Sequence, residues 1–99
     1  MKLHRMVVTQ GIHNAGKTIP MFTSFVRDCL DRFFSADYGE MCEEDLLANT
    51  RAQVLGGRIF ASYDTELVPE RKIYIIADAE DDNGYRDMTI LFPSEYSRA

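Results

Sequence analysis

Residues 72–92 read KIYIIADAEDDNGYRDMTILF, and the expected architecture follows from this stretch. Lys72–Ala77 carries apolar side chains at both alternating positions, which predicts a strand buried on both faces at the centre of a sheet. Asp82-Asn83-Gly84 has the residue types of a tight hairpin turn, and Met88–Phe92 resumes an alternating pattern beyond it. A connection this short joins antiparallel strands, because a parallel pair needs a crossover of about a dozen residues or more.

Two further strands are predicted upstream of this hairpin. Arg58–Tyr63 alternates, with Ile59, Ala61 and Tyr63 on one face, and the short Thr65–Glu70 connection allows it to pair antiparallel with the central strand. Arg5–Thr9 reads as a short strand near the start of the chain.

Two helices are expected between these strands. From Thr18 to Ala36 apolar residues recur at helical spacing, with Thr18 as the N-cap and Pro20 in the first turn, where proline is tolerated. From Glu43 to Leu55 a second helix begins with acidic residues and ends at a pair of glycines. The predicted fold class is α+β, an antiparallel meander of three to four strands with two helices packed on one face.

Composition is that of one ordinary domain spanning residues 1–99. With 45% hydrophobic and 27% charged residues, the chain can bury a single core. The residues Met1–Arg5 lack the apolar segment of a secretory signal, and no apolar run reaches the roughly 18 residues of a membrane span, so a cytoplasmic location is expected. A net charge of −5 disfavours direct nucleic-acid binding and suits a partner protein with a basic surface.

A phosphate-loop pattern, GIHNAGKT, occupies Gly11–Thr18. In a phosphate-loop enzyme, Lys17 contacts the terminal phosphates and Thr18 holds magnesium, at the end of a strand in a parallel sheet. The short connections predicted here do not build such a sheet, so we interpret the segment as a loop in which Gly11 and Gly16 permit turns. Nucleotide binding by Gly16, Lys17 and Thr18 remains an alternative.

No other pattern in the chain predicts catalysis, a metal or a cofactor. Cys29 falls on the apolar face of the first predicted helix and is expected to be a buried thiol. Together with Cys42, His4 and His13 it lacks the paired spacing of metal ligands. The acidic segment 78–84 is similar to the first half of a calcium-binding EF-hand loop, but it lacks the glycine and the flanking helices and reads as a solvated hairpin tip.

A dense acidic patch with one aromatic residue lies before and at the start of the second predicted helix: Asp37, Tyr38, Glu40, Glu43, Glu44 and Asp45. In one interpretation these residues form a loop and complement the positive end of the helix dipole. In the other they form a docking surface, because an exposed tyrosine ringed by carboxylates suits a basic partner.

The chain resembles a family of short proteins from phages, plasmids and bacterial genomes that are described as plasmid-related or restriction-modification-associated. The resemblance extends over nearly the full length and is carried by the segments VVTQG (7–11), DYGEMCEED (37–45) with Asn49, GGRIFASY (56–63), KIYII (72–76) and LFPSEY (91–96). The chain departs from the family at Ala36–Glu40, where members carry GDWGD, and at Ala77–Asp81, where they carry TEADRS. It is thus identified as a divergent member, and the resemblance supplies no catalytic residues.

These observations favour a non-enzymatic, acidic binding protein of a phage or mobile element. Its most concrete form is an inhibitor of a host defence system, of the anti-CRISPR or anti-restriction type, that contacts a basic nucleic-acid-binding effector through the acidic patch. Two alternatives remain: a minimal nucleotide-binding protein that uses Gly11–Thr18, and a structural module that self-associates through the open edge of its sheet or through the sheet face away from the helices.

Overall fold

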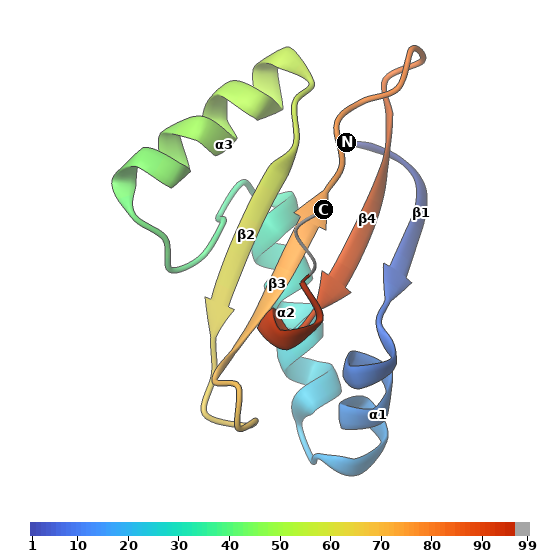
Figure 1. The fold of residues 1–99 in the computed structure, drawn as a ribbon, viewed down its shortest axis with the longest axis vertical. Coiled ribbons are helices and arrows are strands. Elements are labelled where there is room, and N and C mark those ends of the chain that lie inside the picture. Colours follow the sequence, from blue (N-terminus) through green and yellow to red (C-terminus); the bar gives the residue numbers. More distant parts are fainter. Residues whose placement is uncertain (97–99) are drawn as a thin grey trace.

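The computed structural model describes residues 1–96 and contains three α-helices and four strands (Figure 1). The elements follow in the order β1 (Lys2–Val8), α1 (Gln10–Thr18), α2 (Phe22–Phe34), α3 (Glu43–Leu55), β2 (Ile59–Asp64), β3 (Lys72–Ala77), β4 (Tyr85–Leu91) and a 3-10 turn, η1 (Pro93–Glu95). The predicted α+β class is confirmed. The predicted bounds of β3 and α3 are also confirmed.

The four strands form one sheet in the order β1-β4-β3-β2. The pairs β2–β3 and β3–β4 are antiparallel, as the short connections between them require. The expected meander is incomplete, however, because β1 pairs parallel with β4, the last strand within residues 1–96. This parallel pair is possible because all three helices and two strands lie between its members along the chain.

The segment after β1 is a helix, which corrects two expectations. Gln10–Thr18 forms α1, whose first turn is capped by the hydroxyl of Thr9 and whose buried side chains are Ile12 and Ala15. The helix predicted over Thr18–Ala36 therefore does not begin at Thr18. Its first turn is interrupted at Pro20: the residue before this proline is extended, and the residue after it has a left-handed φ of 68°.

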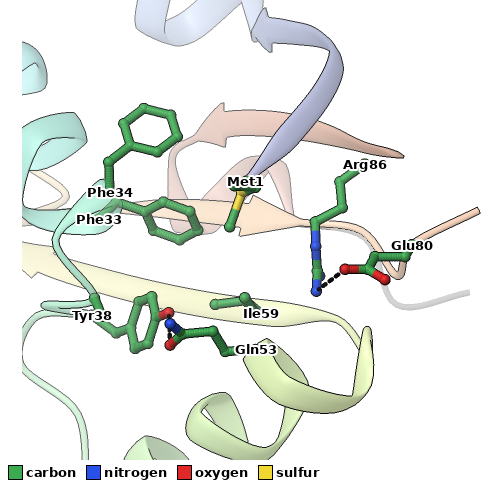
Figure 2. Close-up of a pocket in the computed structure, with 9 residues that line it drawn as sticks. Met1, Phe33, Phe34, Tyr38, Gln53, Ile59, Glu80 and Arg86 are labelled. Atoms are coloured by element: carbon green, nitrogen blue, oxygen red, sulfur yellow. Dashed lines mark hydrogen bonds and ion pairs between the residues drawn. The ribbon is translucent and has the colours of Figure 1, made fainter. Parts of the chain in front are cut away.

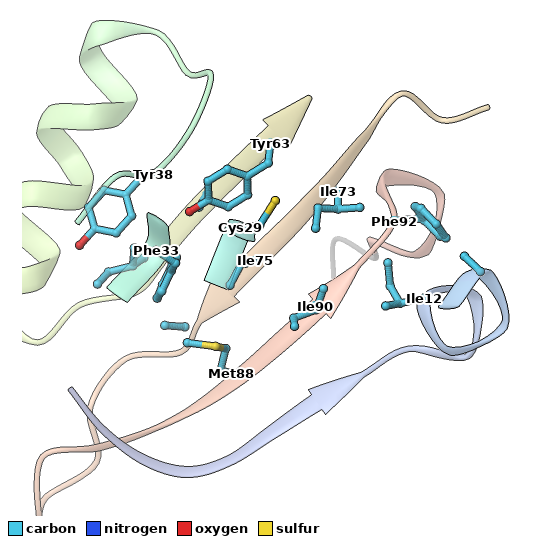
Figure 3. Close-up of a cluster of buried hydrophobic side chains, with 14 of the residues drawn as sticks. Ile12, Cys29, Phe33, Tyr38, Tyr63, Ile73, Ile75, Met88, Ile90 and Phe92 are labelled. Atoms are coloured by element: carbon cyan, nitrogen blue, oxygen red, sulfur yellow. The ribbon is translucent and has the colours of Figure 1, made fainter. Parts of the chain in front are cut away.

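Helix α2 lies across one face of the sheet (Figure 1), and buried side chains of this helix and of the strands meet there (Figure 3). Phe22, Cys29 and Phe33 are fully buried on this helix, which confirms the buried thiol. Strands β2, β3 and β4 form the other side of this core with fully buried side chains: Ile59, Ala61, Tyr63, Ile73, Ile75, Ala77, Met88 and Ile90. Alternate residues of β2 and of β4 thus form the inward face of the sheet.

The outer edge of β2 is sealed by two neighbouring segments. The side chain of Asn49, on α3, donates a hydrogen bond to the Phe60 carbonyl (2.7 Å) and accepts one from the Phe60 N–H (3.1 Å). The backbone at 38–40 takes up the groups of Ser62, whose carbonyl accepts from the Glu40 N–H at 2.8 Å. Both contacts occupy backbone groups that an edge strand otherwise presents to solvent.

Candidate functional site

The phosphate-loop pattern does not form a loop. Gly11–Thr18 lies entirely within α1, so its glycines sit in a helix and the expectation of a turn-forming loop is wrong. The hydroxyl of Thr18 donates to the carbonyl of Asn14 at 3.0 Å instead of facing a bound cation. Lys17 is exposed at the C-terminal end of the helix. In this conformation the backbone N–H groups near Lys17 point along the helix and do not form the cradle that a phosphate requires.

The N-terminal end of α1 already holds an anion from the chain itself, the carboxylate of Glu95. This carboxylate accepts hydrogen bonds from the Gly11 N–H (3.0 Å), the Thr9 hydroxyl (2.6 Å) and the Phe92 N–H (2.9 Å). Burial raises the pKa of Glu95, but these three hydrogen bonds outweigh burial, and the pKa lies below its ordinary value. The position where a helix N-terminus binds a phosphate is therefore filled by a side chain.

The first half of the acidic patch is a structural clasp. Tyr38 is only 5% exposed, so the exposed tyrosine of the docking hypothesis is wrong. Its ring packs edge-on against Phe33, its hydroxyl donates to Gln53 at 2.8 Å, and burial raises its pKa. Gly39 follows with φ of +86°, and a Cβ on this residue would lie 1.9 Å from the Ser62 carbonyl oxygen. The Asp-Tyr-Gly sequence thus joins the end of α2 to the edge of β2.

Arg32 neutralises the carboxylates on either side of Tyr38. Its guanidinium donates to both oxygens of Asp37, at 2.7 and 3.2 Å, and lies 3.6 Å from Glu40. The hydrogen bond from Arg32 is the main reason that the pKa of Asp37 lies below its ordinary value. The guanidinium also lies over the ring of Tyr63, 4.9 Å from its centroid. These carboxylates are therefore engaged within the protein.

The second half of the patch is exposed at the start of α3. Glu43, Glu44 and Asp45 form the first turn of the helix, where carboxylates complement the dipole. Asp45 accepts a hydrogen bond from the Cys42 thiol at 3.1 Å, whereas Glu43 and Glu44 have no hydrogen bond or ion pair among the interactions of residues 1–96. The structure thus splits the predicted patch into a paired part and a free part.

The outer face of α3 carries apolar side chains that nothing in the described chain covers. Leu47 is 58% exposed and Val54, two turns further along the same face, is 79% exposed. The inner face packs Leu46 and Ala52 against the core and points Asn49 at β2. Leu47 and Val54 lie seven positions apart, so helical periodicity places them on one face of α3, but periodicity does not show that this face points away from the sheet.

A cleft of about 290 Å³ lies between the C-terminal ends of α2 and α3 (Figure 2). Its apolar wall includes Phe33 and Phe34, and its polar end holds the buried Arg86. Arg86 donates to the carbonyls of Gly57, Asp78 (3.1 Å) and Ala52 (3.2 Å), and it lies 3.6 Å from Glu80. The guanidinium thus caps the C-terminal end of α3, and its hydrogen bonds are made to backbone carbonyls of this chain.

Sequence reasoning overlooked Arg86, although a signal was present. The alternation that turns Met88 and Ile90 inward also turns residue 86 inward, two positions earlier on β4. A buried arginine needs several acceptors, and the ends of α3 and β3 supply them.

The other titratable residues are dispersed. His4 pairs with Asp81 at 2.6 Å, His13 is exposed on α1, and burial raises the pKa of the Cys29 thiol to about 12. Within residues 1–96, no group of three His, Cys, Asp or Glu side chains is arranged to hold a metal ion. The helices of the described chain also lack the length and apolarity needed to cross a membrane. Comparisons with protein-family models, curated proteins and solved structures found no match to this chain.

Proposed function

We propose that this protein acts by binding another protein, without catalysis, through one side of α3. We define the α3 surface as Glu43, Glu44, Leu47, Arg51 and Val54. The observation that carries the proposal is the exposure of Leu47 and Val54 in line with two unpaired carboxylates. The outward side of a helix that packs at the edge of a sheet is normally polar, so apolar residues there favour a binding role.

The chemistry of the α3 surface specifies its partner. Full burial of a leucine or valine side chain contributes about 1.5–3 kcal/mol, so Leu47 and Val54 need an apolar groove. Glu43 and Glu44 precede them on the helix and need basic residues at one end of that groove. The net charge of −5 steers the whole molecule toward a basic partner.

A nucleic-acid-binding defence effector in the cytoplasm of a bacterial host is the partner class we propose. Such effectors carry basic grooves for nucleic acid, and an acidic protein seated in one blocks that groove. The resemblance to short proteins of phages and plasmids supports this choice, and the exposed carboxylates on α3 provide the complementary charge. The protein is then an inhibitor that acts by contact.

Affinity capture from bacterial lysate tests this proposal when the α3 surface is varied. We expect the double substitution Leu47→Asn with Val54→Asn to lower the affinity for the captured partner by about ten-fold for each residue replaced. The double substitution Glu43→Lys with Glu44→Lys should also weaken capture. This loss should grow as the salt concentration is lowered, because the new lysines and the basic residues of the partner then repel each other more strongly.

The matched control is Met21→Asn, which removes an equally exposed apolar side chain from the turn between α1 and α2. All these positions are exposed, so circular dichroism should show unchanged folds. Equal capture by the wild type and by the Leu47/Val54 variant, with both proteins folded, would refute a role for the α3 surface.

A further inference from the structure

The two edges of the sheet differ. The backbone groups of β2 are taken up by Asn49 and by residues 38–40, whereas the outer side of β1 faces no other element of the described chain (Figure 1). An open edge strand presents unpaired N–H and C=O groups that can pair with another strand.

The second half of β1 combines this open edge with exposed apolar side chains. Met6, Val7 and Val8 are 44%, 41% and 44% exposed. The Thr9 N–H donates to the Ile90 carbonyl at 3.1 Å, which fixes the alternation along the strand: Val7 and Thr9 bond toward β4, while the backbone groups of Met6 and Val8 point outward.

We propose that two copies of this chain pair through their β1 strands, antiparallel and about a twofold axis at Val7. Met6 of each copy then lies opposite Val8 of the other copy, and the outward groups of both residues form a hydrogen-bonded pair. Val7 faces Val7 of the second copy across the axis. The two sheets become continuous, and the interface is isologous.

The distribution of charge on β1 favours this register. The basic residues Lys2 and Arg5 lie toward the start of the strand, and the exposed apolar residues Met6–Val8 form its end. With the axis at Val7, Arg5 lies opposite Thr9 of the second copy. An axis at Arg5 places two arginines opposite each other, which is destabilising.

An apolar cleft next to β1 provides room for the second copy. It measures about 250 Å³ and is lined by Val8, Ile12, Phe22 and Val26, with Lys17 and His13 also in its wall. Met6 and Val8 share the sheet face covered by α2, because they pair with the buried Met88 and Ile90. The side chain of Met6 from the second copy, opposite Val8, therefore lies against this cleft, and methionine is well suited to fill an irregular gap.

Sedimentation measurements over micromolar to millimolar concentrations test the pairing. We expect the mass of the wild type to rise toward that of a dimer. Val7→Lys places two ammonium groups on the twofold axis and should weaken association at least ten-fold. The matched control, Val54→Lys on α3, should associate like the wild type. A wild-type mass that stays monomeric throughout this range overturns the proposal, whatever the variants do.

Disulfide trapping tests the register itself. In a Cys42→Ser background, Val7→Cys should form a covalent dimer on mild oxidation, because facing residues at a non-hydrogen-bonded antiparallel position have Cα atoms about 4.5 Å apart, within the range that a disulfide spans. Arg5→Cys lies opposite Thr9 of the second copy and should remain uncrosslinked. A dimer that resists Val7→Lys, or that crosslinks at residue 5 in preference to residue 7, overturns the twofold axis at Val7. Capture through α3 is independent of these results, so either proposal can fail alone.

Discussion

Replacement of Glu95 by glutamine probes the contact that holds the start of α1. The carboxylate accepts from the Thr9 hydroxyl at 2.6 Å, from the Phe92 N–H at 2.9 Å and from the Gly11 N–H at 3.0 Å. A glutamine side chain has one accepting oxygen, and its NH₂ group must face at least one of these donors. The shape of the side chain is preserved, so the variant removes the negative charge and one hydrogen-bond acceptor with little change in packing.

The cost follows from the number and kind of these bonds. Hydrogen bonds to a charged group contribute about 1.5–3 kcal/mol and neutral ones about 0.5–1.5 kcal/mol, and a buried donor without an acceptor costs about 1–3 kcal/mol. We therefore expect Glu95→Gln to lower the free energy of unfolding by about 2–3 kcal/mol. In a domain of this size the melting temperature should fall by roughly 4–8 °C for each kcal/mol.

The pH dependence separates this explanation from a simple packing defect. The pKa of Glu95 lies below its ordinary value of 4.5 in the folded chain, so its stabilisation is fully present above that value and is lost as the pH falls through the folded pKa. Urea unfolding followed by circular dichroism should show the full difference between wild type and variant at neutral pH and a smaller one near pH 3. A difference below about 0.5 kcal/mol at neutral pH, or one that does not shrink in acid, would refute the reasoning.

Three further predictions concern residues of the site. Gly39→Ala should lower the free energy of unfolding by about 3 kcal/mol or more in urea titrations, because its φ is +86° and the new Cβ meets the Ser62 carbonyl at 1.9 Å; a near-neutral effect would contradict the clasp. Titration with a thiol reagent should modify Cys42 rapidly and Cys29 only on unfolding, because burial raises the pKa of Cys29 to about 12. Calorimetry with ATP or GTP and magnesium should show no heat of binding that depends on Lys17. A heat of binding that the Lys17→Ala substitution abolishes would restore the nucleotide hypothesis.

The elements predicted most accurately are those whose signals are local. β3 is recognisable from its continuous apolar run, and α3 from its acidic first turn and its terminal glycines, one of which has φ of +82°. The hairpin turn before β4 is likewise encoded by adjacent residues and contains Gly84 with φ of +82°. Each of these signals acts within a few residues of the structure it specifies.

α1 was missed because its stabilisation is not local. Glycine costs about 1 kcal/mol relative to alanine inside a helix, and two glycines within nine residues argue against one. The compensation comes from burial of Ile12 and Ala15 and from the carboxylate of Glu95, which lies more than eighty positions away in the sequence. No pattern within residues 10–18 predicts the contact with Glu95.

The prediction that Tyr38 is exposed within the acidic patch was wrong for a related reason. Neighbouring residues show that Tyr38 is surrounded by carboxylates, and this suggested a surface. Its burial depends on Phe33, on Gln53 and on the backbone of β2, which are brought together only by the fold. Periodicity could place Leu47 and Val54 on one face of α3, but not decide whether a neighbour covers that face.

The link between Glu95 and α1, together with the pairing of β1 and β4, has a consequence for synthesis. The ribosome releases the first eighteen residues early, yet their strand partner spans residues 85–91 and their helix cap is residue 95. A nascent chain can assemble α2, β2 and β3 beforehand, while Met6–Val8 waits as an unpaired apolar segment. During synthesis β1 can therefore pair with β4 only after residue 91 has been made, and factors that bind nascent chains have this interval in which to act on the strand.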